Sequence, residues 1–199
     1  MEYVRDSLLG LSAVAVAVFA WMGLKAWRKE LIYKARFETA RSMWHAASDL
    51  KGSFEQARNP FTSSPEWADR IPEIGETDTE SQVLNEWHAR AKRFNGVIAG
   101  VNKVIEVQWE AEILFDEDSV QSVKDAVKSY RESYAELSSA ISSYFDSRLS
   151  EVKTGELYQD QEWLKGLHKI IYGRRDDELS KKVNNATDKL SLVLKQYVK

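Results

Sequence analysis

The chain has 199 residues, enough for one domain or one elongated bundle beside a terminal segment. Its 28 Lys and Arg residues nearly balance 31 Asp and Glu residues, and the net charge of −3 lacks the basic excess of a nucleic-acid-binding protein. Because there is no cysteine, disulfides, thiolate metal sites and cysteine nucleophiles are excluded.

The first predicted element is an apolar helix from Leu8 to Leu24, a stretch without a charged residue. At about 1.5 Å per residue it would be roughly 25 Å long, which suffices to cross a bilayer core with help from its flanks. We therefore expect residues 1–24 to form a membrane anchor, with the span at about residues 7–24.

Two other interpretations of this segment are a cleaved signal peptide and a buried helix of a soluble protein. A signal peptide would begin with basic residues alone, whereas this chain carries Glu2 and Asp6 beside Arg5. A buried helix at the edge of a core would have a polar face, and Ser12 is the one polar residue of the segment. An uncleaved anchor fits the residues better than either alternative.

Basic residues follow the apolar segment and predict its orientation. They are Lys25, Arg28, Lys29, Lys34 and Arg36, with Glu30 as the one acid among them. Since an excess of Lys and Arg marks the cytoplasmic side, the N-terminus should lie outside and the rest of the chain inside, at a bacterial inner membrane. The same residues could bind anionic lipid head groups, although a role in topology alone is the simpler interpretation.

Small residues recur within the predicted span at spacings of three and four. Gly10, Ala13, Ala17 and Ala20 therefore share one side of the helix. Such a stripe lets two membrane helices approach closely, which favours self-association or a membrane-embedded partner.

The basic helix is expected to continue over residues 25–58 as a stalk that joins a bundle. A loop at 59–79 follows and contains all three prolines of the chain. Loops of this length are uncommon in compact domains and are often functional. Phe61, Trp67 and Ile71 predict that part of the loop packs back onto the body.

Residues 80–199 are expected to form a helical bundle together with 25–58. In the first helix of this region the predicted core stripe is Leu84, Trp87, Ala91, Phe94, Ile98, Val101 and Ile105, and a stutter then moves it to Trp109 and Ile113. The next helix, capped at Asp116, carries Val120, Val123, Val127, Tyr130, Tyr134, Leu137, Ile141 and Tyr144. A short helix carries Leu157, Trp163, Leu164, Leu167, Ile170 and Ile171, and the last carries Leu179, Val183, Ala186, Leu190, Val193 and Tyr197. These heptad-like stripes predict an all-α fold, a four- or five-helix bundle with coiled-coil-like packing.

Gly96 and Gly100 lie one turn apart in the middle of the first of these helices. Each costs about 1 kcal/mol relative to alanine in a helix. A close helix crossing would offset that cost, either inside the bundle or with a partner, and the crossing inside the bundle is the simpler interpretation.

Motifs of catalysis and cofactor binding are missing from the sequence. No phosphate-binding glycine loop, nucleophile elbow or Glu-x-x-His pair is present, and His45, His88 and His168 are isolated from one another along the chain. We therefore expect no enzyme activity, no cofactor and no metal site.

The sequence leads to one principal functional hypothesis and two alternatives. The principal one is a membrane-tethered interaction module, a scaffold, adaptor or sensor subunit whose partners are the lipid bilayer and either a second copy or another membrane-associated protein. In layout the chain resembles bacterial proteins with one N-terminal span and a cytoplasmic helical bundle. One alternative is an envelope or lysis protein with its domain outside, which resembles the anchored coiled-coil spanins of phages in plan. The other is an enzyme or ligand-binding bundle with an unrecognised polar pocket.

Overall fold

The computed structural model describes residues 2–155, 160–173 and 176–198, and for residues 2–14 it describes the backbone alone. These residues form five α-helices and one short 3-10 helix, without a strand, so the predicted all-α fold is confirmed. In chain order they are α1 (Glu2–Ala57), η1 (Ser64–Glu66), α2 (Asp78–Leu114), α3 (Glu117–Thr154), α4 (Gln161–Ile171) and α5 (Glu178–Val198).

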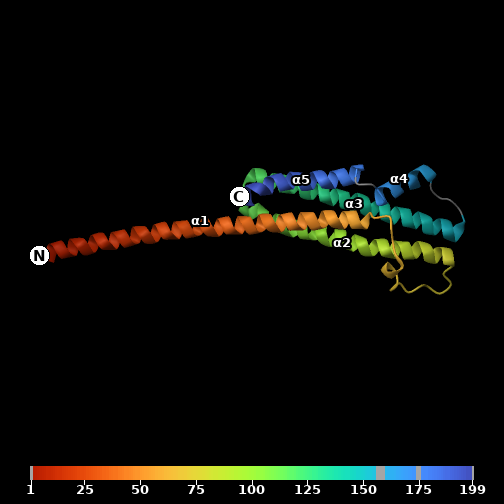
Figure 1. Ribbon diagram of the computed structural model, residues 1–199, viewed down its shortest axis with the longest axis horizontal. Helices are drawn as coiled ribbons and strands as arrows, with labels where there is room; N and C mark the ends of the chain where they lie inside the picture. The colour runs from red at the N-terminus through yellow and green to blue at the C-terminus, as the bar shows by residue number, and fades with distance from the viewer. Residues whose placement is uncertain (1, 156–159, 174–175, 199) are drawn as a thin grey trace.

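The helices form an antiparallel bundle of four columns (Figure 1). α1 packs against α2 and α5, and α3 packs against the same two helices. The fourth column consists of two helices, α4 and α5, which follow one another along α3 with a break between them. We call the end with the α2–α3 turn and the end of α5 the near end, and the end with the loop at residues 58–77 the far end (Figure 1).

α1 is much longer than the bundle, and its N-terminal part projects from the near end (Figure 1). Its buried residues begin at Thr39 and Ala40 and continue to Ala57, whereas residues 15–34 are all exposed. Among the described residues, no helix has an apolar stretch long enough to cross a membrane. Residues 7–14 of the predicted span lie outside the residues whose side chains are described.

The residues that α2 buries in the core are shifted along the sequence by about one position from the predicted stripe. Its buried apolar residues are Val83, Ala89, Phe94, Val97, Val101, Val104, Val107, Ala111. Trp87 and Ile98 are instead exposed at 43% and 36%, whereas Phe94 and Val101 of the predicted stripe are buried and Leu84 and Ile105 are half-buried. The predicted stutter is wrong, because Trp109 and Ile113 face solvent at 63% and 84% exposure.

Burial confirms the predicted stripe of α3, and that of α5 except at Val193, which is half-buried beside the buried Leu194. On α3, Val123, Val127, Tyr130, Leu137 and Ile141 are buried, and the other three predicted positions are half-buried. The fully buried Tyr130 hydroxyl lies 2.8 Å from Thr187 Oγ1 on α5, which in turn donates to the carbonyl of Val183. A polar pair thus joins the two helices inside the core.

The end of α5 closes the near end of the bundle around the α2–α3 turn. Asp116 is the N-cap of α3, as predicted, and its carboxylate accepts the backbone N–H of Ser119. The Tyr197 hydroxyl donates to the same carboxylate, and its ring stacks on Phe115 at 4.1 Å between centroids. The hydrogen bond from Tyr197, together with those from Ser119, lowers the pKa of Asp116 to about 2.

Two details of the loop and of the short helix depart from the prediction. Phe61 and Ile71 were expected to pack onto the body, but they are 82% and 87% exposed, while Trp67 is half-buried. Leu157, expected at the start of the short helix, lies outside the described residues, and α4 begins at Gln161 with Asp160 as its N-cap.

Candidate functional site

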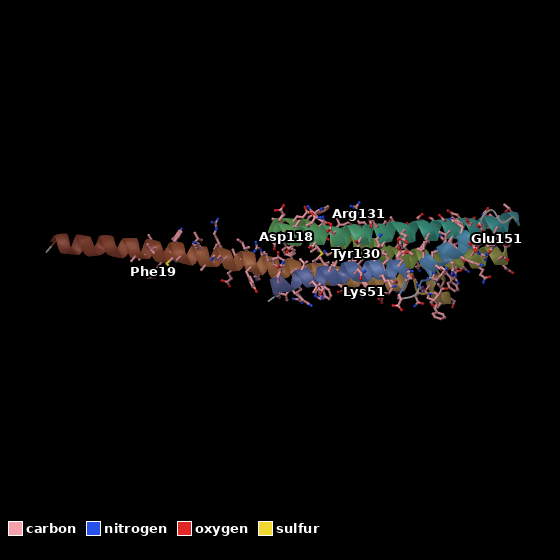
Figure 2. The ribbon with its side chains drawn as sticks, turned by 90° about the horizontal axis from the view of Figure 1, so that it is seen from above. Phe19, Lys51, Asp118, Tyr130, Arg131 and Glu151 are labelled. Carbon is pink, nitrogen blue, oxygen red and sulfur yellow. The ribbon has the colours of Figure 1, made fainter. Side chains whose placement is uncertain are left out.

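The projecting part of α1 is an apolar helix without a neighbouring helix along its described residues. Its large side chains are exposed on every side of the helix, including Val16 at 68%, Phe19 at 72% and Trp21 at 63%. Figure 2 shows Phe19 on the projecting part of α1, well away from the bundle. Of the four small residues predicted to pack in the membrane, Ala17 and Ala20 are exposed here, and Gly10 and Ala13 lie outside the described side chains.

The basic residues that follow occupy the segment between this apolar part and the bundle. Lys25, Arg28 and Lys29 are exposed, and the ammonium of Lys25 lies 5.2 Å from the ring centroid of Trp21. Lys34 is exposed and lies 4.0 Å from Glu38 one turn ahead. Exposed charged groups therefore gather directly after the apolar segment.

Arg36 differs from the other four basic residues. Its Nε donates to the carbonyl of Leu114 at 2.6 Å, at the end of α2. The last carbonyls of a helix lack partners within the helix and carry partial negative charge, so a guanidinium there is favourable. Arg36 thus fastens α1 to the end of α2, a role that its place in a basic run did not suggest.

The two glycines of α2 face α1 but at different separations. A Cβ added to Gly100 would lie 2.9 Å from Leu50 Cδ1 and 3.2 Å from Leu50 Cα. A Cβ added to Gly96 would lie 3.6 Å from Ser53 Oγ, an ordinary contact. The close approach of α1 and α2 is therefore centred on Gly100.

Arg90 is fully buried at the far end, where it donates hydrogen bonds to backbone carbonyls at and just after the end of α1. Its guanidinium donates to the carbonyls of Ala57, Asn59 and Pro60, with the bond to Ala57 at 3.1 Å. The guanidinium carbon also lies 4.4 Å from the ring centroid of Tyr172. Burial lowers the pKa of Arg90.

Arg58 bridges the break between α4 and α5. It donates to the carbonyls of Lys169 and Ile170, at the end of α4, and to Ser180 on α5. It also forms a bidentate ion pair with Asp177, whose carboxylate accepts the backbone N–H of Ser180 as a cap of α5. Burial alone would raise the pKa of Asp177, but the hydrogen bonds from Arg58 and Ser180 bring it below its ordinary value.

Three arginines thus perform the same task, because each guanidinium caps the free carbonyls at the end of another helix. Arg36 caps α2, Arg90 caps α1 and Arg58 caps α4. Sequence reasoning missed all three roles. Each depends on which helix end lies beside the arginine, and no local pattern carries that information.

Further basic side chains of α2 hold the loop at 58–77 against the bundle. Arg93 forms a bidentate pair with Glu66 and donates to the carbonyls of Asn59 and Phe61. This pairing is the main cause that lowers the pKa of Glu66 to about 2. Arg70, within the loop, pairs with Glu76 in the same bidentate manner.

The three histidines lie apart and have different surroundings. His88 Nε2 is 3.1 Å from Asp69, His168 packs against Tyr172, and His45 is exposed on α1. Among the described residues, no three His, Asp or Glu side chains are grouped so that they could hold a metal ion.

A hollow lies toward the far end, beside the break between α4 and α5, with a volume of about 970 Å³. The apolar residues Phe54, Leu179 and Val183 line it together with the polar Lys51 and Asn184. Arg58 also lines it, but the protein's own carbonyls, Asp177 and Ser180 already occupy the nitrogens of that guanidinium.

The features that could carry function are therefore an exposed apolar helix, the basic residues that follow it, and a bundle whose buried charges are engaged in holding helix ends. No known protein family, no characterised protein and no solved structure matches the chain.

Proposed function

We propose that this protein is a membrane-tethered helical interaction module. The N-terminal part of α1 is its anchor, with the span at residues 7–24, and the bundle is displayed at the cytoplasmic face of a bacterial inner membrane. The N-terminus lies outside, and the bundle acts by contacts with other protein chains.

The observation that carries the proposal is the exposure of an apolar helix on all sides. Every described residue from Ala15 to Leu24 is exposed. Fully burying one large apolar side chain is worth about 1.5–3 kcal/mol, so leaving Val16, Phe19 and Met22 in water forgoes several kcal/mol. A lipid environment recovers that free energy for the whole circumference of the helix, which a groove on one partner protein does not.

The basic residues support the proposed orientation. Lys25, Arg28 and Lys29 are exposed directly after the apolar segment. Because Arg36 is engaged at the end of α2, the orientation rests on four of the five residues that the sequence suggested.

The bundle supports an interaction role through the way in which it uses its charged groups. Arg58, Arg90 and Arg93 are occupied by carbonyls and carboxylates of the protein itself. Large apolar side chains are meanwhile exposed on the outside, among them Trp109 and Ile113. Contacts on the outer surface are therefore better supported than chemistry in an internal site.

Extraction of isolated membranes with alkaline carbonate tests the anchor. The wild-type chain should stay in the membrane pellet, and the pair Val16→Lys and Phe19→Lys should move it to the supernatant. Each lysine at the centre of a span costs about 2.5–3.5 kcal/mol of insertion free energy. The matched control, Ile113→Lys with Leu192→Lys, alters two residues of the bundle surface and should stay in the pellet. A wild-type chain released by carbonate would refute the proposal.

A reporter enzyme that is active only outside the cytoplasmic membrane, fused after Lys199, tests the orientation. An inactive fusion supports the cytoplasmic bundle. An active fusion would overturn the proposed orientation and favour the envelope or lysis protein, whose domain lies outside.

A further inference from the structure

The apolar side of α1 continues past the proposed span into the segment that leads to the bundle. Leu24, Trp27 and Leu31 are 51%, 56% and 46% exposed. Along the sequence they extend the small-residue stripe of Gly10, Ala13, Ala17 and Ala20, so that the spacings alternate between three and four without interruption from residue 10 to residue 31. Three heptads of this kind make the seam of a left-handed coiled coil.

From this seam we infer that the partner of α1 is a second copy of the chain, packed in parallel along residues 10–31. The inference rests on the proposed function, since the shared membrane gives both copies one orientation. A parallel second copy presents the same residues at the same height. Among the described residues, it therefore places Ala17, Ala20 and Leu24 opposite their equivalents inside the bilayer, and Trp27 and Leu31 opposite their equivalents outside it.

The place of the seam on α1 leaves room for this partner. At 3.6 residues per turn, the seam lies roughly a third of a turn away from the face that Met43 and Leu50 bury in the bundle. The second helix therefore approaches from the side without displacing α2 or α5.

The seam ends where the bundle begins. The next positions of the repeat are Lys34 and Glu38, which are both exposed and lie 4.0 Å from each other. Apolar pairing between copies thus stops at the level at which α1 enters its own bundle.

The natural absence of cysteine makes disulfide crosslinking a direct test. Leu31→Cys should give a crosslinked dimer when isolated membranes are mildly oxidised, because equivalent seam residues bring their Cβ atoms close enough for a disulfide. The matched control is Ile32→Cys, which changes the adjacent residue, 50% exposed, on another side of the helix. We expect at least about fivefold more dimer from Leu31→Cys than from Ile32→Cys, with Trp27→Cys and Leu24→Cys behaving like Leu31→Cys.

Carbonate extraction of the same membranes distinguishes a failure of the parallel pairing from a failure of the membrane anchor. A membrane-bound chain that gives equal or no crosslinking at positions 31 and 32 overturns the parallel pairing and leaves the anchor intact. A chain that carbonate releases refutes the anchor, and the pairing within the membrane fails with it.

Discussion

Substitution of the two glycines of α2 by alanine should change the stability of the bundle in opposite directions. Gly96→Ala and Gly100→Ala add the same methyl group to the same helix, one turn apart, toward α1. The two variants differ in the distance from the added methyl group to the nearest atoms of α1. We expect Gly96→Ala to stabilise the protein and Gly100→Ala to destabilise it.

The magnitudes follow from helix propensity and from the separations at each site. Alanine is favoured over glycine inside a helix by about 1 kcal/mol, and this gain applies to both variants. At position 96 the new Cβ lies 3.6 Å from Ser53 Oγ, so the variant should retain most of the gain. At position 100 it lies 3.2 Å from Leu50 Cα as well as 2.9 Å from Leu50 Cδ1, and a backbone atom moves only if α1 and α2 separate. Overpacking of this kind costs about 1–3 kcal/mol, so Gly100→Ala should lose up to about 2 kcal/mol net.

Urea unfolding of the full chain in mild detergent, followed by circular dichroism at 222 nm, would measure both variants. The helix signal comes mainly from the bundle, and the midpoint should rise for Gly96→Ala and fall for Gly100→Ala at an unchanged slope. If Gly100→Ala is stabilised as much as Gly96→Ala, the close approach of α1 and α2 at Leu50 is wrong.

Two further substitutions test the contacts that join the helix ends. Arg58→Ala removes the guanidinium that pairs with Asp177 and caps the last carbonyls of α4. The free energy of unfolding should fall by about 3 kcal/mol, because removal of one partner from a buried ion pair is costly. Substitution of the exposed Arg131 by alanine should change it by less than about 0.5 kcal/mol, and equal effects of the two variants in urea unfolding would contradict the role of Arg58. The lowered pKa of Asp116, about 2, means that its contribution to stability is complete above the pKa of about 4 in the unfolded chain and is lost as the pH falls through about 2. Asp116→Asn should therefore lose less stability than the wild type between pH 5 and pH 2.5, and parallel urea midpoints of the two proteins over that interval would contradict the assignment.

The sequence was sufficient for those parts of the fold that depend on local chemistry. Helix N-caps such as Asp116 and the stripes of α3 and α5 follow from residue type and spacing within one segment. The core track of α2 did not, because Trp87 and Ile98 are larger than the buried Ala89 and Val97 and gave a stronger apparent stripe. α2 contacts both α1 and α3, so its buried face is wide, and periodicity alone does not choose between adjacent tracks.

The parts that escaped prediction depend on which segments meet in space. Phe61 and Ile71 were expected to hold the loop by apolar contacts, whereas guanidinium groups on α2 and within the loop hold it through carbonyls and carboxylates. The roles of Arg36, Arg58 and Arg90 likewise require knowledge of which helix ends come together. A basic residue in a polar run has the same local sequence whether it faces solvent or closes another helix.

The continuity of α1 fixes the rotational phase of the bundle relative to its N-terminal segment. No proline and no break interrupts this helix from Glu2 to Ala57. One residue inserted between Leu24 and Ala35 would turn the bundle by about 100° about the helix axis and raise it by about 1.5 Å. Seven inserted residues would bring it back to within about 20° of its first heading while raising it by about 10 Å. The number of residues in this segment thus sets both the rotational orientation of the bundle and its distance from the N-terminal end. Because α1 is unbroken, a rotation of its N-terminal end about the helix axis is transmitted to the far end of the bundle.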